Sequence, residues 1–239
     1  MDIRLNGRNA LITGGSLGIG FAIADRFARS GGNVAIVARR ADVLEQARDA
    51  ILQNADAEVV AIAGDITDAE QCKRVYGQAK DALGPIDILV NNAGSSQKGP
   101  FEEITDDIWQ ADLDLKLFGA IRFSRLVLPD MKSRRWGRIL NILNSGAKAM
   151  AGEFAPYNVL VNSLHVGRIK SDQWVRRNAA RQDGQSLDDF YAEMAEIIPL
   201  GRVGEAEEFA NIACFQASDA GAYITGTAIN VNGGMIPVT

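Results

Sequence analysis

The feature that most constrains this sequence is a glycine-rich turn at residues 13–20, which reads Thr-Gly-Gly-Ser-Leu-Gly-Ile-Gly. An apolar run at 9–12 precedes it and predicts a short buried strand, and residues 21–28 have apolar side chains at helical spacing. A strand, a glycine-rich turn and a helix in this order form a phosphate-binding element, because the N–H groups of the new helix face the anion. Glycines at this spacing also occur in plain turns, so the rest of the chain must decide between the two interpretations.

Three glycines of the turn have an expected role. Gly14 permits a sharp bend, and Gly18 and Gly20 let the backbone approach a pyrophosphate and the sheet. The predicted phosphate-binding residues are Gly14, Ser16, Leu17, Gly18, Ile19 and Gly20.

Length and composition favour one α/β domain, 1–239. A hydrophobic content of 47% is sufficient for a large core, and a net charge of −5 argues against nucleic acid or an anionic membrane surface as the main partner. Cys72 and Cys214 lie far apart without neighbours at metal-ligand spacing, so we expect reduced, buried thiols and no metal site. No apolar leader or membrane-length run is present, and we expect a cytoplasmic protein with no membrane partner.

Strand and helix patterns alternate along the chain without a linker. Such alternation predicts a Rossmann-type doubly wound parallel sheet, in which ligands bind at the carboxyl ends of the strands. The expected strands after the first are 34–38, 58–63, 86–90, 138–142 and 228–231, and the expected helices include 68–83 (capped by Asp68), 106–132 and 205–217.

A series of short motifs occurs in a fixed order at 13–20, 64–65, 91–94, 137–139, 158–162, 199–202, 224–226 and 230–234. Together these motifs resemble the short-chain dehydrogenase/reductase family, classical type, from Leu5 to Gly234. The resemblance implies a nicotinamide dinucleotide, a small-molecule carbonyl or alcohol as substrate, and a homodimer or homotetramer.

The resemblance also bears on which dinucleotide binds. Ala38 stands where relatives that prefer NAD carry Asp, and Arg39 follows at the position that is basic in relatives that prefer NADP. A guanidinium can hold a 2′-phosphate through paired hydrogen bonds, so we expect NADP(H) rather than NAD(H), bound by Arg39 and Arg40. The alternative is a pair of surface arginines after a strand.

Other positions are assigned to the cofactor by the same resemblance. Asp65 is expected to contact adenine, unless it only caps a turn, and 91–94 is expected to pack on a ribose, unless it is a purely structural turn. A later turn, 166–171, resembles the one that binds the nicotinamide carboxamide. The residues expected at these places are Asp65, Ile66, Asn92, Ala93, Gly94, Ile169 and Ser171.

The family's catalytic Tyr and the Lys four residues after it are not found. The only tyrosine in range is Tyr157, and Val161 stands four residues later. Tyr157 is instead expected to lead into the sixth strand.

The segment that should hold this pair is too short. Parallel neighbours need a crossover of about a dozen or more residues, normally a helix. Only eleven residues, 146–156, separate Ser145 from Tyr157, so they cannot form a helix of three or more turns, and one face of the sheet should be left bare. Either the printed chain lacks a segment, which we favour, or a true deletion leaves a nucleotide-binding protein without reductase chemistry.

Two further catalytic positions depart from the family. Its serine position falls on Asn144, with Ser145 one residue later, and we favour Ser145 for orienting the substrate. Lys116 stands where the family commonly has an Asn that supports a proton path. A buried lysine can carry protons, but Lys116 can equally be a salt-bridging substitute.

The last region is expected to form a substrate lid at about 172–198. Its arginines would suit either an anionic substrate or an ordinary solvated helix face. His165, the only histidine, is expected to be structural. Two functions therefore follow: an NADP(H)-dependent oxidoreductase that interconverts carbonyl and alcohol, or a non-catalytic dinucleotide-binding or regulatory member of the family.

Overall fold

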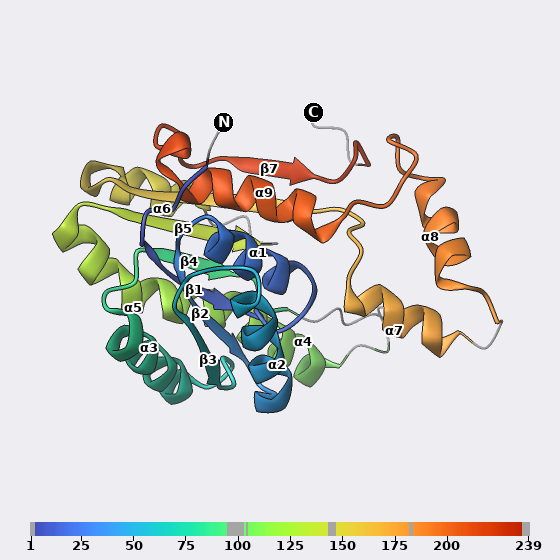
Figure 1. The fold of residues 1–239 in the computed structure, drawn as a ribbon, viewed down its shortest axis with the longest axis horizontal. Coiled ribbons are helices and arrows are strands. Elements are labelled where there is room, and N and C mark those ends of the chain that lie inside the picture. The colour runs from blue at the N-terminus through green and yellow to red at the C-terminus, as the bar shows by residue number, and fades with distance from the viewer. Residues whose placement is uncertain (1–2, 95–102, 104, 143–146, 182–183, 236–239) are drawn as a thin grey trace.

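The computed structural model describes residues 3–94, 103, 105–142, 147–181 and 184–235 and forms one seven-stranded sheet in the order β3-β2-β1-β4-β5-β6-β7 (Figure 1). Every neighbouring pair of strands is parallel, which confirms the doubly wound sheet. The strands are β1 (Asn9–Thr13), β2 (Asn33–Ala38), β3 (Val59–Ala63), β4 (Ile88–Asn91), β5 (Gly137–Ile142), β6 (Val159–Val166) and β7 (Ala228–Val231).

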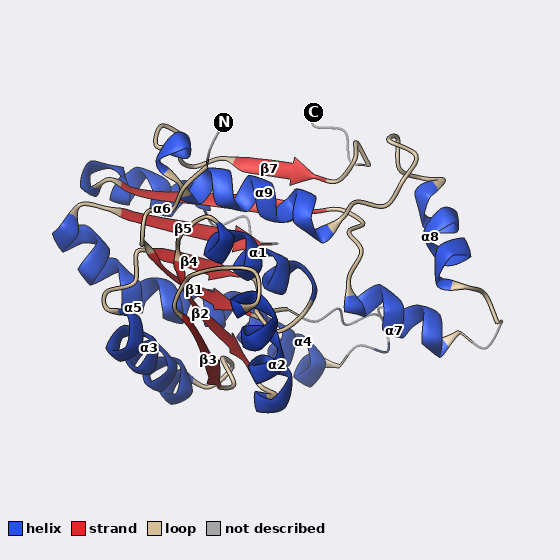
Figure 2. Ribbon diagram, viewed as in Figure 1, coloured by secondary structure: helices blue, strands red, loops and turns tan. Residues whose placement is uncertain are grey.

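Helices cover both faces of the sheet (Figure 2). Each face has its own apolar cluster, as expected for strands whose residues are almost all apolar. One face carries α1 (Gly18–Arg29), α2 (Ala41–Leu52) and α9 (Ala206–Ala217), and the other carries α3 (Ala69–Leu83), α5 (Gly119–Arg134) and α6 (Ala147–Phe154). Beyond the carboxyl end of β6, α7 (Asp172–Ala180) and α8 (Leu187–Ala195) extend away from the sheet (Figure 1).

Several local predictions are confirmed. Asp68 caps α3, because its Oδ1 accepts hydrogen bonds from the backbone N–H groups of Glu70 (2.7 Å) and Gln71 (3.0 Å). Cys72 and Cys214 are both buried and free. None of the described helices combines the length and apolar character needed to cross a membrane.

The long helix expected at 106–132 is not uniform. It begins as α4 (Asp106–Leu113), changes to a π-helical turn at Asp114–Phe118, and continues as α5. Such turns insert a residue into the helical repeat and change which side chains face the sheet. The π-helical turn contains Lys116 and places it on the side of the helix that faces the carboxyl ends of the strands.

The crossover between β5 and β6 is as short as the sequence implies. Its helix α6 has eight residues, about two turns, and a 3-10 turn at Ala155–Tyr157 follows it. The expectation that one face would be left bare is wrong, because Ala151 and Phe154 are buried against β6. Residues 147–154 form one continuous helix.

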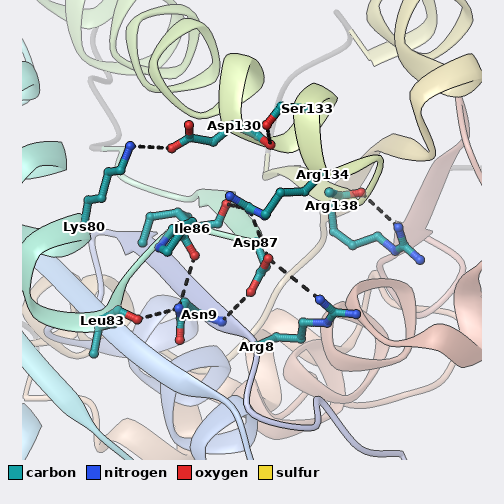
Figure 3. Close-up of polar contacts among 12 residues, drawn as sticks. Arg8, Asn9, Lys80, Leu83, Ile86, Asp87, Asp130, Ser133, Arg134 and Arg138 are labelled. Atoms are coloured by element: carbon teal, nitrogen blue, oxygen red, sulfur yellow. Dashed lines mark hydrogen bonds and ion pairs between the residues drawn. The ribbon is translucent and has the colours of Figure 1, made fainter.

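The amino ends of the central strands are held by a charged network (Figure 3). The Asp87 carboxylate accepts a hydrogen bond from the backbone N–H of Asn9 (3.1 Å) and pairs with Arg134 (3.0 Å) and Arg8 (3.9 Å). Nearby, burial lowers the pKa of Arg138 to about 10. This edge lies opposite the expected site, and the contacts of Asp87 hold its strands together.

Candidate functional site

The candidate site lies where the carboxyl ends of β1 and β4 meet. The chain leaves β1 toward β2 and β3 on one side and returns to β4 and β5 on the other, which makes this the switch point where doubly wound sheets bind ligands. A cavity of about 200 Å³ opens there. Its described lining comprises Thr13, Ile66, Asn91, Ala93, Leu113, Leu115, Lys116, Leu117, Ala120 and Ile142.

The glycine turn has the shape of a phosphate cradle. Gly14 and Gly18 have φ of 68° and 59°, in the left-handed region that favours glycine. A Cβ atom on Gly20 would lie 2.2 Å from the Gly14 carbonyl oxygen, so only glycine allows this close approach. Leu17 precedes α1 without a side-chain cap, and no described group accepts from the N–H of Gly18 or Gly20. These residues therefore fit an anion at the start of α1.

Thr13 connects the two strands that form the site. Its hydroxyl accepts from the backbone N–H groups of Asn92 and Ala93, both at 3.0 Å, and donates to the carbonyl of Val90 at 3.3 Å. The Asn92 amide group donates to the Thr13 and Gly14 carbonyls at 3.0 and 3.2 Å. These bonds give the Asn92 side chain a structural role, and its role in cofactor binding remains a prediction.

Arg39 and Arg40 stand at the carboxyl end of β2. Both are exposed, and neither is paired with any described acidic group. Their guanidinium groups are therefore available to a ligand phosphate next to the glycine turn.

Asp65 and Ile66 follow β3. One oxygen of Asp65 accepts from the N–H of Thr67 (3.0 Å) and from its hydroxyl (2.8 Å), so the turn-capping alternative is also realised. Because only Oδ1 is used in these bonds, contact of the other oxygen with adenine stays a prediction. Ile66 is buried and lies against Gly119 at the start of α5, where it lines the cavity floor.

The segment after β6 reaches the same edge. Ser171 lies close to the glycine turn, since a Cβ on Gly18 would be 3.4 Å from the Ser171 Cβ. Ile169 and Gly204 form a parallel bridge, in which Gly204 bonds the residues on either side of Ile169. The Gly204 carbonyl accepts from the N–H of Lys170 (2.8 Å), and the Gly204 N–H donates to the carbonyl of Arg168 (2.9 Å). The N–H and C=O of Ile169 itself point away from Gly204 and form no hydrogen bond with any described group. This free donor and acceptor would match the oxygen and the NH₂ group of a carboxamide.

Lys116 is the only ionisable residue in the described lining of the cavity. Its aliphatic chain lies over Gly94, whose added Cβ would be 3.6 Å from Lys116 Cε. Its ammonium group donates to Asp112 at 2.9 Å, and both side chains are mostly buried. Asp112 was not identified from the sequence, although a carboxylate four residues before a helical lysine is a recognisable pair.

The remaining catalytic candidates are not assembled here. Asn144 and Ser145 lie outside the described residues. Tyr157 precedes β6 at the amino edge of the sheet, as predicted, and its ring lies 4.5 Å from Lys132 Nζ. His165 is half-buried on β6 without a described acidic partner, and no group of three or more His, Cys, Asp or Glu among the described residues could hold a metal ion.

Comparison with family models gives two matches that together span nearly the whole chain. The model described as short chain dehydrogenase matches residues 8–148, and the model described as Enoyl-(Acyl carrier protein) reductase matches residues 142–236. The 3-oxoacyl-[acyl-carrier-protein] reductase of Aquifex aeolicus is 31% identical over 256 aligned positions, covering 98% of this chain and 100% of the relative. That alignment is longer than this chain of 239 residues, so the relative carries positions that this chain lacks.

Solved structures share the fold over the full length. L-sorbose reductase from Gluconobacter frateurii, complexed with NADPH and L-sorbose, has a TM-score of 0.95 at 29% identity and covers 100% of both chains. An NADPH-bound short chain oxidoreductase from Pseudomonas aeruginosa PAO1, described as containing an atypical catalytic center, has a TM-score of 0.89 at 33% identity and covers 99% of both chains. On these matches and its seven-stranded parallel sheet, the chain belongs to the short-chain dehydrogenase/reductase family of oxidoreductases.

Proposed function

We propose that this chain uses NADP(H) to interconvert a carbonyl compound and an alcohol. The observation that carries the proposal is the arrangement at the switch point. There the start of α1, which has no side-chain cap, adjoins Arg39 and Arg40, which pair with no described acidic group, and a cavity whose described lining holds one ionisable residue. Relatives that share the whole fold have been solved with NADPH, which agrees with the cofactor expected from Arg39.

Each part of the cofactor has a proposed partner in this chain. The N–H groups at the start of α1 would hold the pyrophosphate, and Arg39 with Arg40 would hold the 2′-phosphate. The free N–H and C=O of Ile169 would hold the carboxamide. When bound, NADPH supplies the hydride that reduces a carbonyl carbon.

Lys116 is the proposed proton donor. Reduction of a carbonyl places negative charge on its oxygen, and the ammonium group of a lysine that lines the cavity can donate a hydrogen bond and then a proton to that oxygen. Asp112 holds the Lys116 side chain in place through their ion pair. In the oxidative direction the same nitrogen would accept the proton. Ser145 remains our candidate for orienting the substrate oxygen.

A second function is favoured by a specific observation. None of the four tyrosines, at 76, 157, 191 and 223, is among the described residues that line the cavity. A family member that binds NADPH without turnover would be compatible with this arrangement. Under both functions we propose a cytoplasmic, oligomeric protein whose single domain carries a substrate lid at about 172–198.

Steady-state assays distinguish the two functions. NADPH oxidation should be followed at 340 nm with a broad panel of ketones and aldehydes, using wild type, Lys116→Met and Lys73→Met. Lys73 is the matched control, because it pairs with Glu70 (2.7 Å) on α3, away from the site. Loss of a general acid lowers rates by about 10²–10⁴-fold.

We expect Lys116→Met to lower kcat by at least about 100-fold while the Kd for NADPH changes less than about threefold. Unchanged kcat in Lys116→Met would remove this residue from the mechanism. Saturable NADPH binding without turnover by wild type across the whole panel would support the non-catalytic function instead.

A further inference from the structure

A second cavity, of about 580 Å³, lies between α7 and α8 and is distinct from the one at the switch point. Its described lining combines three arginines, Arg168, Arg177 and Arg181, with the aromatic rings of Trp174 and Phe190. Nothing in the proposed handling of NADP(H) uses these side chains.

The arginines lie on the aromatic rings. The guanidinium carbons of Arg168 and Arg177 are 5.8 and 4.8 Å from the centre of the Trp174 ring, and that of Arg181 is 5.4 Å from the centre of Phe190. A guanidinium over an aromatic face is held in orientation while its N–H groups remain able to donate within its own plane. Trp174 and Phe190 also contact each other, with ring centres 6.3 Å apart, so the rings form one support.

Among the described residues that line the cavity, positively charged side chains outnumber negatively charged ones. Two carboxylates, Glu193 and Glu196, also line it, and Glu193 pairs with Arg181, whose Nη1 lies 3.3 Å from its Oε2. Arg168 is half-buried, and no described carboxylate lies within ion-pair distance of it. A half-buried cation without an acidic partner favours binding of an external anion, because desolvation of the guanidinium is then compensated.

The position of Arg168 connects this cavity to the cofactor site. Arg168 directly precedes Ile169, whose free N–H and C=O are the proposed carboxamide contacts. The Ile169 side chain packs toward Gly204, whereas the Arg168 side chain reaches Trp174 in the lid. Two adjacent residues of one turn therefore belong to the cavity and to the proposed carboxamide site.

We propose that this cavity binds the anionic group, a carboxylate or a phosphate, of a substrate whose apolar or aromatic body packs on Trp174. The inference rests on the proposed function and adds the substrate class to it. Arg168 determines the specificity, since it combines partial burial, an aromatic support and the absence of a described acidic partner. Arg176, on the neighbouring helix α7, is the contrasting case, because its side chain is 66% exposed and paired with Asp172 (2.7 Å).

Binding should be tested separately from turnover. Calorimetric titrations of wild type, Arg168→Met and the control Arg176→Met would use 4-acetylbenzoate, 4-acetylphenyl phosphate and the neutral methyl 4-acetylbenzoate. Titrations with saturating NADP+ keep the anions from the 2′-phosphate site, and titrations without nucleotide show whether binding depends on it. Melting temperatures and the Kd for NADPH verify that the variants are folded.

We expect wild type to bind at least one anion about 30-fold more tightly than the ester, equivalent to about 2 kcal/mol at 1.4 kcal/mol per tenfold. Arg168→Met should abolish this preference and Arg176→Met should keep it. The two anions distinguish a carboxylate from a phosphate as the preferred group. Equal binding of anions and ester by wild type, or a preference retained in Arg168→Met, would overturn the inference.

The same compounds should then be used as substrates. Anion binding that depends on Arg168 without NADPH oxidation would contradict the proposed reductase function but leave the anion site in place. NADPH oxidation without an anion preference would contradict the anion site but leave the proposed reductase function in place.

Discussion

Thr13→Val tests the connection that joins the two halves of the site. Valine has nearly the shape of threonine but lacks the hydroxyl, so the N–H groups of Asn92 and Ala93 and the carbonyl of Val90 each lose a partner. A buried donor left without a partner costs about 1–3 kcal/mol. Because the two N–H groups belong to partly buried residues, we expect a total loss of about 2–4 kcal/mol in the free energy of unfolding.

Urea denaturation measures this loss. With an m-value of about 3 kcal/mol/M, the midpoint should fall by about 1 M at unchanged m. Thr13→Ser is the matched control, because it keeps the hydroxyl and removes one methyl group, which costs about 0.8 kcal/mol. Equal midpoints for Thr13→Val and Thr13→Ser would refute the reasoning, since the hydroxyl would then contribute nothing.

Two further predictions concern the cradle and the last helix. Gly20→Ala should raise the Kd for NADPH at least about tenfold, because its Cβ would lie 2.2 Å from the Gly14 oxygen. Gly77→Ala is the control and should leave the Kd unchanged, because its Cβ would meet nothing within 4 Å. Equal Kd values for the two variants would contradict this prediction. Hydrogen bonds from Arg202 and from the backbone of Glu205 lower the pKa of Glu208 to about 2 from 4.5. Because the folded-state pKa is the lower one, the stabilisation is present above pH 4.5 and is lost as pH falls toward 2. Glu208→Gln should therefore melt below wild type at pH 6 by more than at pH 3, and a constant difference would show that its ionisation is not involved.

Local patterns were sufficient to predict the sheet and the cap of α3. The run at 34–38 is apolar at every position, as a strand covered on both faces must be, and β2 includes all of it. Asp68 caps a helix through bonds to the next turn, so its signal lies within a few residues. The glycine-rich turn was also predictable from the sequence, because the left-handed torsion angles at Gly14 and Gly18 favour glycine over other residues.

Features that depend on contacts between distant segments were not predictable. The π-helical turn at Asp114–Phe118 interrupts a pattern that reads as one helix. We expected the short crossover to leave one face of the sheet bare. That expectation ignored the fact that two helical turns can cover the sheet when they carry large side chains such as Phe154, which is buried. The sequence leaves the lid arginines open between an anionic substrate and a solvated helix face, and it gives no sign that Arg168, which precedes the lid, lies against Trp174.

The central claim is that the switch-point site binds NADP(H) through its 2′-phosphate. Isothermal titration of the wild-type protein with NADPH and with NADH, repeated for Arg39→Ala, tests it most directly. We expect wild type to bind NADPH at least about tenfold more tightly than NADH, and Arg39→Ala to lose most of that difference. No saturable binding of NADPH, or equal Kd values for NADPH and NADH in wild type, would contradict the account.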